Sequence, residues 1–255
     1  MDFNLQNFVN TTSSIALSTN TILAQNLFNP NLDYQFFSSG DNDDTTITSI
    51  TYTFDATTPI SRIALLDHNF KDFTVYYNGT TANTFSLNNA DTSVSDYSSN
   101  SETSQYFKFD TIQASSVTIE ATGTIISNKE KYLSFLYISD NYFEFDRIPS
   151  ANSYKPLITP KQVVHSMADG GTKVHDIDKK FSVDIKYKFL TTAQKNQLRT
   201  IYDLETPFYF CLFPTTTSWD KVFFEANWVG PFDFETFSDN ASTAGHSGSI
   251  KLRET

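Results

Sequence analysis

Short segments in which apolar and polar residues alternate recur along the 255-residue chain. The clearest runs from Phe181 to Phe189, where every odd position is apolar or aromatic and every even position is polar or charged. Such alternation is typical of a strand with one buried face and one wet face. The pattern therefore predicts a half-buried strand over 181–189, and its recurrence limits most of the chain to β-structure.

The alternation ends after Phe189, and the residues that follow match the start of a helix. Thr191-Thr192-Ala193-Gln194 has the form of a capping box, in which a hydroxyl is followed three residues later by a Gln that can reach back. Leu198, Ile201 and Tyr202 continue at helical spacing. This pattern predicts one short helix over 191–204.

The first half of the chain carries several further strand patterns. In "SITYTFD" the residues Ile50, Tyr52 and Phe54 share a face, and "RIALLDHNF" is apolar on both faces, which predicts a central strand at 63–66. "DFTVYYNG" alternates up to the turn pair Asn78-Gly79. Short strands separated by turn signals favour a β-sandwich.

A proline-rich stretch, "DRIPSANSYKPLITPK", separates the two halves and shows little periodicity. We therefore predict a mainly β protein with an N-terminal β-sandwich at 1–148 and a linker at 149–160. A β-rich domain at 161–255 is predicted to follow, containing the helix at 191–204. Its strands are expected near 161–167, 181–189, 207–213, 222–229, 232–236 and 248–253.

Composition excludes several classes of function. The net charge is −11 and no basic run occurs, which argues against nucleic acid as a partner. No apolar run reaches the roughly 18 residues that cross a membrane, and the opening "MDFNLQNFVNTTSS" lacks a basic region followed by an apolar one. We therefore expect no membrane insertion and no secretion. The lone Cys211 cannot form an internal disulfide and is expected to be buried.

Two groups of residues could hold a metal. His165 and His175 flank the predicted turn at Gly170-Gly171, where exposed histidines are expected and a metal across the hairpin is the alternative. The loop "GDNDD" offers Asp41, Asp43 and Asp44 as calcium ligands, but it lacks the spacing of an EF-hand. We expect a solvated turn there, with a structural Ca²⁺ as the alternative, and no other cofactor.

No catalytic motif stands out. Asp67-His68 follows a buried strand, but there is no G-x-S-x-G, and no spacing selects a carboxylate pair for glycoside hydrolysis. We expect His68 and Asn69 to hydrogen-bond the backbone at the strand end and to fix the turn into "FKDF". The chain is therefore predicted not to be an enzyme.

The two tryptophans are candidates for stacking against a sugar. Trp219 lies beside Asp220 in a polar segment and is expected to be exposed, which makes it the candidate binding residue. Trp228 is in phase with Phe224 and Ala226 and is expected to be buried.

Two longer stretches resemble known families. "AQNLFNPNLDYQFFSSG" and "ISRIALLDHNFKDFTVYYNG" resemble discoidin-like, galactose-binding-domain-like sandwiches of bacteriophage tail and baseplate proteins, on Asn26-Leu27, Ser38-Ser39 and His68-Asn69. "YLSFLYIS" is similar to the closing strand of such a domain. "KKFSVDIKYKFLTTAQKNQLRTIYDLETPFYFCLFP" is similar to a module of phage tail-tip proteins, with the helix signature at 190–194 and at Leu198.

The resemblance implies a structural component of a phage tail tip or baseplate that docks neighbouring tail proteins and could contact host-surface glycans. It implies a homo-oligomer of three or six copies in the virion, made in the host cytoplasm, and it transfers no catalytic residue. The alternative is a free-standing carbohydrate-binding protein of the lectin type.

Overall fold

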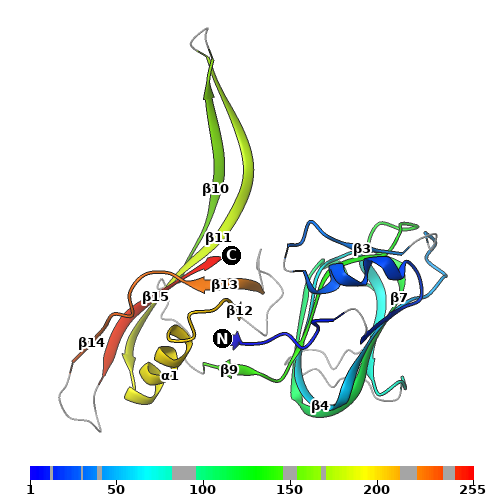
Figure 1. The fold of residues 1–255 in the computed structure, drawn as a ribbon, viewed down its shortest axis with the longest axis horizontal. Helices are drawn as coiled ribbons and strands as arrows, with labels where there is room; N and C mark the ends of the chain where they lie inside the picture. Colours follow the sequence, from blue (N-terminus) through cyan, green and yellow to red (C-terminus); the bar gives the residue numbers. More distant parts are fainter. Residues whose placement is uncertain are drawn as a thin grey trace. The chain divides into compact units, whose positions relative to one another are not determined.

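The chain forms two compact units, both built mainly from β-strands, in the computed structural model (Figure 1). The sandwich unit comprises Asp2–Tyr142 and Cys211–Phe223, and the helical unit comprises Met1, Phe143–Phe210 and Phe224–Thr255. The structure describes residues 1–11, 14–29, 31–38, 42–81, 96–145, 154–167, 171–212, 223–237 and 245–255. The predicted fold class, a mainly β chain with a sandwich and one short α-helix, is confirmed.

The sandwich unit contains a sheet in the order β3-β8-β4-β7-β5-β6, with β2 paired to β4. Its elements are β1 (Asp2–Asn4), β2 (Ile15–Leu17), the 3-10 helix η2 (Thr21–Phe28), β3 (Phe36–Phe37), β4 (Thr48–His68), β5 (Phe70–Tyr77), β6 (Asp96–Tyr97), β7 (Gln105–Thr124) and β8 (Tyr132–Ser139). The predicted central strand lies within β4, which has β7 on one side and β8 on the other.

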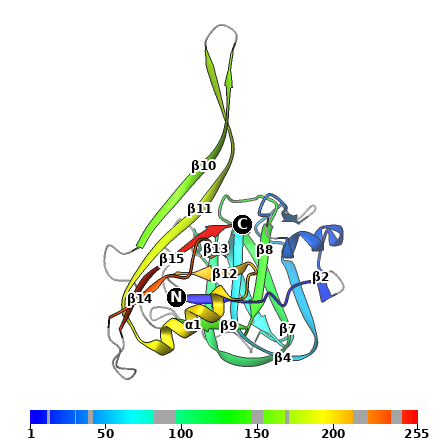
Figure 2. The same ribbon diagram turned by 60° about the vertical axis from the view of Figure 1, so that its left-hand side comes forward.

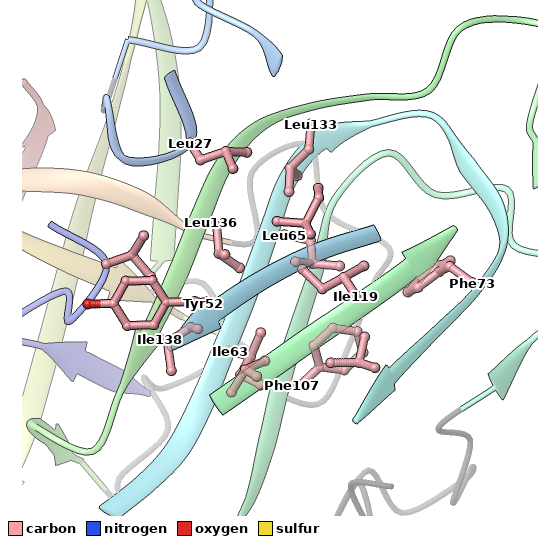
Figure 3. Packing of buried hydrophobic residues seen from close by; sticks show 14 of the residues in the cluster. Leu27, Tyr52, Ile63, Leu65, Phe73, Phe107, Ile119, Leu133, Leu136 and Ile138 are labelled. Carbon is pink, nitrogen blue, oxygen red and sulfur yellow. The ribbon is translucent and has the colours of Figure 1, made fainter. Parts of the chain in front are cut away.

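One core fills the sandwich, and both halves of β4 contribute to it. Ile50 and Tyr52 from the first half and Ile63 and Leu65 from the second half belong to a single buried cluster. Figure 3 shows Tyr52, Ile63 and Leu65 within it. The ladder between β4 and β7 shifts register between Thr53 and Thr58. Such an irregularity bends a strand, which allows the same two long strands to face the core from both layers.

The helical unit contains a sheet in which β10, β11, β15, β13 and β12 are successive neighbours, with β14 paired to β15. Its elements are β9 (Tyr142–Glu144), β10 (Tyr154–Ser166), β11 (Thr172–Leu190), α1 (Thr192–Tyr202), β12 (Phe208–Cys211), β13 (Phe224–Trp228), β14 (Phe234–Thr236) and β15 (His246–Glu254). Along β11 the odd residues Phe181, Val183, Ile185 and Tyr187 are buried, as the alternation predicts. Leu198 and Ile201 of α1 are buried as well.

The predicted capping box is present at the start of α1. The Thr191 hydroxyl accepts a hydrogen bond from the Gln194 backbone N–H at 3.2 Å, and the Gln194 side chain accepts one from the Thr191 backbone N–H at 3.0 Å.

Thr191→Ala is expected to lower the free energy of unfolding by about 1 kcal/mol, because one backbone donor loses its partner. Asp184→Ala, on the wetter face of β11, is expected to cost less than about 0.5 kcal/mol. Chemical denaturation of the two variants should give this order; a larger loss for Asp184→Ala would contradict it.

The predicted linker at 149–160 is wrong from Tyr154 onward, because Tyr154–Pro160 forms the first part of β10. The prolines suggested irregular chain, but β10 is the terminal strand in the order of its sheet. Proline is tolerated on an edge strand because no neighbour requires its missing N–H. The proline content of 154–160 therefore did not indicate a linker, because β10 is an edge strand that accommodates prolines.

The sandwich unit also takes in a segment that the predicted boundary at 148 leaves out. Phe223 stacks on Tyr106 and contacts Tyr137, with ring centroids 5.3 and 4.9 Å apart. A fragment ending at residue 148 would expose those two rings.

Within the described residues, no helix has both the length and the apolar character needed to span a membrane.

Candidate functional site

Two adjacent rows of side chains lie where β3, β8 and the end of β4 are neighbours. Phe37 of β3 is the cross-strand partner of Tyr132 of β8. Ser134 of β8 lies opposite Asp67 of β4, because the flanking pairs are Leu66↔Phe135 and His68↔Leu133. Phe37, Tyr132 and Asp67 are partly exposed, whereas Phe36, Leu133, His68 and Ser134 are fully buried.

The polar row consists of Gln35, Ser134 and Asp67. The Gln35 side-chain amide and the Ser134 hydroxyl each donate a hydrogen bond of 2.6 Å to Oδ2 of Asp67. Among the described residues, no group donates to Oδ1 of Asp67. Two donors thus fix the orientation of a half-buried carboxylate whose second oxygen is available to accept hydrogen bonds from a ligand.

The backbone at Asp67 has an unusual conformation for a residue with a side chain. Its φ is +50°, in the left-handed region, which costs a non-glycine residue about 1–2 kcal/mol. The Asp67 backbone N–H donates to the Ser104 hydroxyl at 3.2 Å. The surroundings therefore hold this strand end in a conformation that aims the carboxylate across the polar row.

The aromatic pair consists of Phe37 and Tyr132. Their ring centroids are 5.8 Å apart, with 48° between the ring planes. Phe37 is 38% exposed and Tyr132 is half-buried. Partial burial raises the pKa of Tyr132, and the nearby charge of Asp67 raises it further. The Tyr132 phenol therefore stays protonated at neutral pH, so the pair offers a largely apolar surface beside the polar row.

Three asparagine side chains hold the backbone beneath these rows. Asn20 donates to the Phe37 carbonyl at 3.0 Å, and Asn26 of η2 donates to the Gln35 carbonyl at 2.8 Å. Asn69 donates to the Glu130 carbonyl at 2.7 Å and accepts from the Tyr132 N–H at 2.9 Å. These bonds tie the short strand β3 and the start of β8 to the rest of the sandwich, so the two rows are positioned before any ligand arrives.

His68 lies directly beneath this face and is confirmed as a structural residue. Its Nδ1 accepts from the Phe70 N–H at 3.1 Å, and its ring stacks on Phe70 with centroids 5.0 Å apart. Burial lowers the pKa of His68 to about 3. His68 and Asn69 thus both hydrogen-bond the backbone at the strand end, as predicted from the sequence.

The described calcium candidates are occupied by hydrogen-bond donors. Asp43 accepts bonds from the hydroxyls and backbone N–H groups of Thr45 and Thr46, at 2.6–2.9 Å. These bonds, led by the Thr45 hydroxyl, hold the pKa of Asp43 well below its usual value. Asp44 accepts from Thr124 and Asn128. Both carboxylates therefore serve as turn caps, while Asp41 lies outside the described residues.

The structure does not bring the remaining predicted candidates together. Trp219 lies outside the described residues, and Trp228 is half-buried rather than fully buried. The register pairs His165 with Lys173 and His175 with Val163, so the two histidines are not opposite each other. Within the described part of the chain, no three His, Cys, Asp or Glu side chains are grouped so that they could hold a metal. Cys211, the one cysteine of the chain, is buried.

Sequence reasoning missed the two rows on the face of the sandwich. Their members come from β4, β8 and the segment 35–37 around β3, which are far apart in the chain, and only the register places them side by side. The sequence did single out Asn26 and Asn69, which support the face, but it gave no signal that Gln35, Ser134 and Asp67 meet.

The sequence matches no protein-family profile and no curated protein sequence. Among solved structures, the chain is similar to chitosan-binding module 1 of a chitosanase/glucanase from Paenibacillus sp. IK-5. That similarity has 12% identity and a TM-score of 0.40, and it covers 52% of this chain and 98% of the module. The chain is also similar to the family 32 carbohydrate-binding module of C. perfringens NanJ in complex with galactose. There the identity is 13% and the TM-score 0.39, over 56% of this chain and all of the module. At these values the interpretation of the site rests on the chain's own residues.

Proposed function

We propose that the sandwich unit binds a carbohydrate on the face formed by β3, β8 and β4, and that it does not catalyse a reaction of this ligand. The observation that carries the proposal is the placement of the partly exposed aromatic pair beside the oriented carboxylate of Asp67. Ligand sites combine apolar and aromatic contact surface with a few fixed polar groups. A pyranose ring has the matching character, with an apolar face and a rim of hydroxyl groups.

The aromatic pair and the polar row make different contacts with the bound sugar. The apolar face of a sugar lies against Phe37 and Tyr132, while Oδ1 of Asp67 accepts a hydrogen bond from a sugar hydroxyl. Gln35 and Ser134 hold the carboxylate rather than the ligand. Glycoside hydrolysis uses two carboxyl groups, one on each side of the scissile bond, and the polar row contains one. Binding without turnover is therefore the function that this face supports.

The test begins with a glycan array probed with the full chain, followed by calorimetry with the best ligand. Phe37→Ala and Tyr132→Ala are each expected to weaken binding about tenfold, since aromatic contacts contribute roughly 0.5–1.5 kcal/mol beyond their buried area. Asp67→Asn is expected to weaken binding about ten- to a hundredfold, because a hydrogen bond to a charged group contributes about 1.5–3 kcal/mol. Asparagine also tolerates the left-handed backbone at this position.

Phe237→Ala is the matched control. Phe237 is an exposed aromatic residue of the helical unit, 57% accessible to solvent, so its removal should leave glycan binding unchanged. Full binding by Tyr132→Ala and Asp67→Asn together would place the glycan elsewhere on the chain. Absence of binding across the whole array would reject the proposal itself.

The second candidate function is that of a structural subunit in a bacteriophage tail tip or baseplate. The observation that favours it is the long β10–β11 hairpin, in which the described side chains at 157–158, 163–167 and 172–174 are all exposed and many of them apolar. In such a particle, repeated copies would present the glycan face several times, and multivalency would compensate for weak single sites. Purified tailed particles should then contain the chain at fixed stoichiometry, three or six copies per tail. Its absence from the particles would leave a free-standing carbohydrate-binding protein.

A further inference from the structure

The β10–β11 hairpin extends past the other strands of its own sheet (Figures 1 and 2). β15 pairs with β11 only from Ser182 to Leu190, whereas β10 pairs with β11 from Thr172 to Ile185. From 172 to 181, β11 therefore has one neighbouring strand among the described residues, and β10 is the terminal strand of the order. We call residues 158–166 and 172–181 the distal ribbon.

Exposed apolar side chains occur on both faces of the distal ribbon. Val164 and Val174 are direct cross-strand partners, so they share a face, and they are 59% and 51% exposed. Val163 points to the opposite face and is 37% exposed. Ile158 at the base and Met167 beyond the tip of β10 are each about half exposed. A two-stranded ribbon without further packing is only marginally stable in water, so these faces are suited to being covered.

Addition of another strand along the edge of β10 is the less suitable way to cover the ribbon. Pro156 and Pro160 lie within β10, and neither has a backbone N–H to offer a neighbour. Prolines on an edge strand are a common protection against pairing with further strands. The faces of the ribbon, rather than its edge, are therefore the surface for a partner.

The charge of the ribbon indicates which partner fits it. Residues 154–181 contain five lysines and three aspartates, whereas the whole chain has a net charge of −11. The hairpin is thus a basic segment on an otherwise acidic chain. Opposite charges steer and orient association, and a second copy of the same chain, with its net charge of −11, supplies the opposite charge for each ribbon.

We propose that the distal ribbon docks on the acidic surface of a second copy of this chain and buries its valine-bearing faces in the contact. The two surfaces in this contact differ, so the contact is of the heterologous kind, which closes into a ring of copies where the rotation permits. This inference is independent of glycan binding, since no residue of the distal ribbon belongs to the polar row or the aromatic pair.

Sedimentation velocity of the full chain tests the proposal. The wild-type protein is expected to assemble beyond the 28.9 kDa monomer with increasing concentration, up to about 100 μM. Assembly should weaken in about 0.5 M salt, because salt screens the charge attraction. The double variant Val164→Asp/Val174→Asp is expected to dissociate at least about tenfold more readily, because it places charges on the buried face.

Two further variants complete the experiment. Ile22→Asp changes an apolar residue of the sandwich unit that is 84% exposed, and it should assemble like the wild type. Lys173→Glu reverses one ribbon charge without touching an apolar residue and should also weaken assembly. Circular dichroism of each variant verifies folding. A wild-type chain that stays monomeric over this range, or a valine double variant that assembles normally, would overturn the proposal.

Discussion

Replacing Arg62 with methionine is expected to lower the free energy of unfolding of the sandwich unit by about 3–5 kcal/mol. Arg62 and Asp2 form an ion pair with 2.9 Å between Nε and Oδ2, and both side chains are excluded from solvent. The Tyr106 hydroxyl donates to the same carboxylate oxygen at 2.9 Å, and the Arg62 guanidinium lies 3.7 Å from the centre of the Tyr142 ring. Without Arg62, the carboxylate of Asp2 would remain buried without its counter-charge.

Two further variants distinguish the effect of burial from the effect of charge pairing on the stability loss of Arg62→Met. Arg199 and Asp203 form an ion pair with 2.8 Å between Nε and Oδ1, but both are more than half exposed, so Arg199→Met should cost less than about 1 kcal/mol. The double variant Asp2→Leu/Arg62→Met should lose less stability than Arg62→Met alone, because no unpaired charge is left inside. Guanidinium denaturation of the full chain measures all three. If Arg62→Met and Arg199→Met lowered the free energy of unfolding equally, the buried ion pair would be no more important for stability than the exposed one.

Lowering the pH from 6.5 to 4 is expected to reduce the free energy of unfolding by about 3 kcal/mol through His68 alone. In the folded chain the pKa of His68 is lowered to about 3 by burial, while an unfolded histidine titrates near 6.5. Between these values the unfolded state binds a proton that the folded state does not, so acid favours unfolding. Above pH 6.5 both states are neutral and the effect vanishes.

His68→Asn should remove most of this slope, because asparagine does not titrate and its side-chain oxygen can still accept from the Phe70 N–H. His165→Gln is the matched control for the loss of a histidine, since His165 is exposed and belongs to the helical unit. Urea denaturation at a series of pH values between 4 and 7.5 gives the slope for each protein. An unchanged slope in His68→Asn would mean that another group controls the acid sensitivity.

Local patterns in the sequence were sufficient for the strands and the helix start, because these depend on neighbouring residues. The cap at Thr191 and the alternation from 181 to 187 both correspond to features of the structure, whereas Phe189 is 66% exposed because the pairing of β11 with β15 shifts register after Tyr187. The linker was misjudged because proline content does not distinguish an irregular segment from an edge strand. The role of Phe223 was missed because it depends on contacts with Tyr106 and Tyr137, which are distant in the sequence.

The candidate site was harder to predict for a related reason. Phe37 and Tyr132 are separated by most of the sandwich unit and meet only through the pairing of β3 with β8. Their residue types are common in this aromatic-rich chain, so composition does not distinguish them. Trp219 drew attention because tryptophan is rare here, whereas the site follows from register, which no local pattern encodes.

The position of β4 between two later strands has a consequence for the way the chain folds. β4 can complete its hydrogen bonding only after β7 and then β8 have been synthesised. Such non-local pairing makes folding slow, because long loops must close before contacts stabilise them. On the ribosome, where chains grow at about 5–20 residues per second, the apolar residues of β4 would stay uncovered for several seconds. During that interval a nascent chain is open to aggregation, and chaperone binding would raise the yield of native protein.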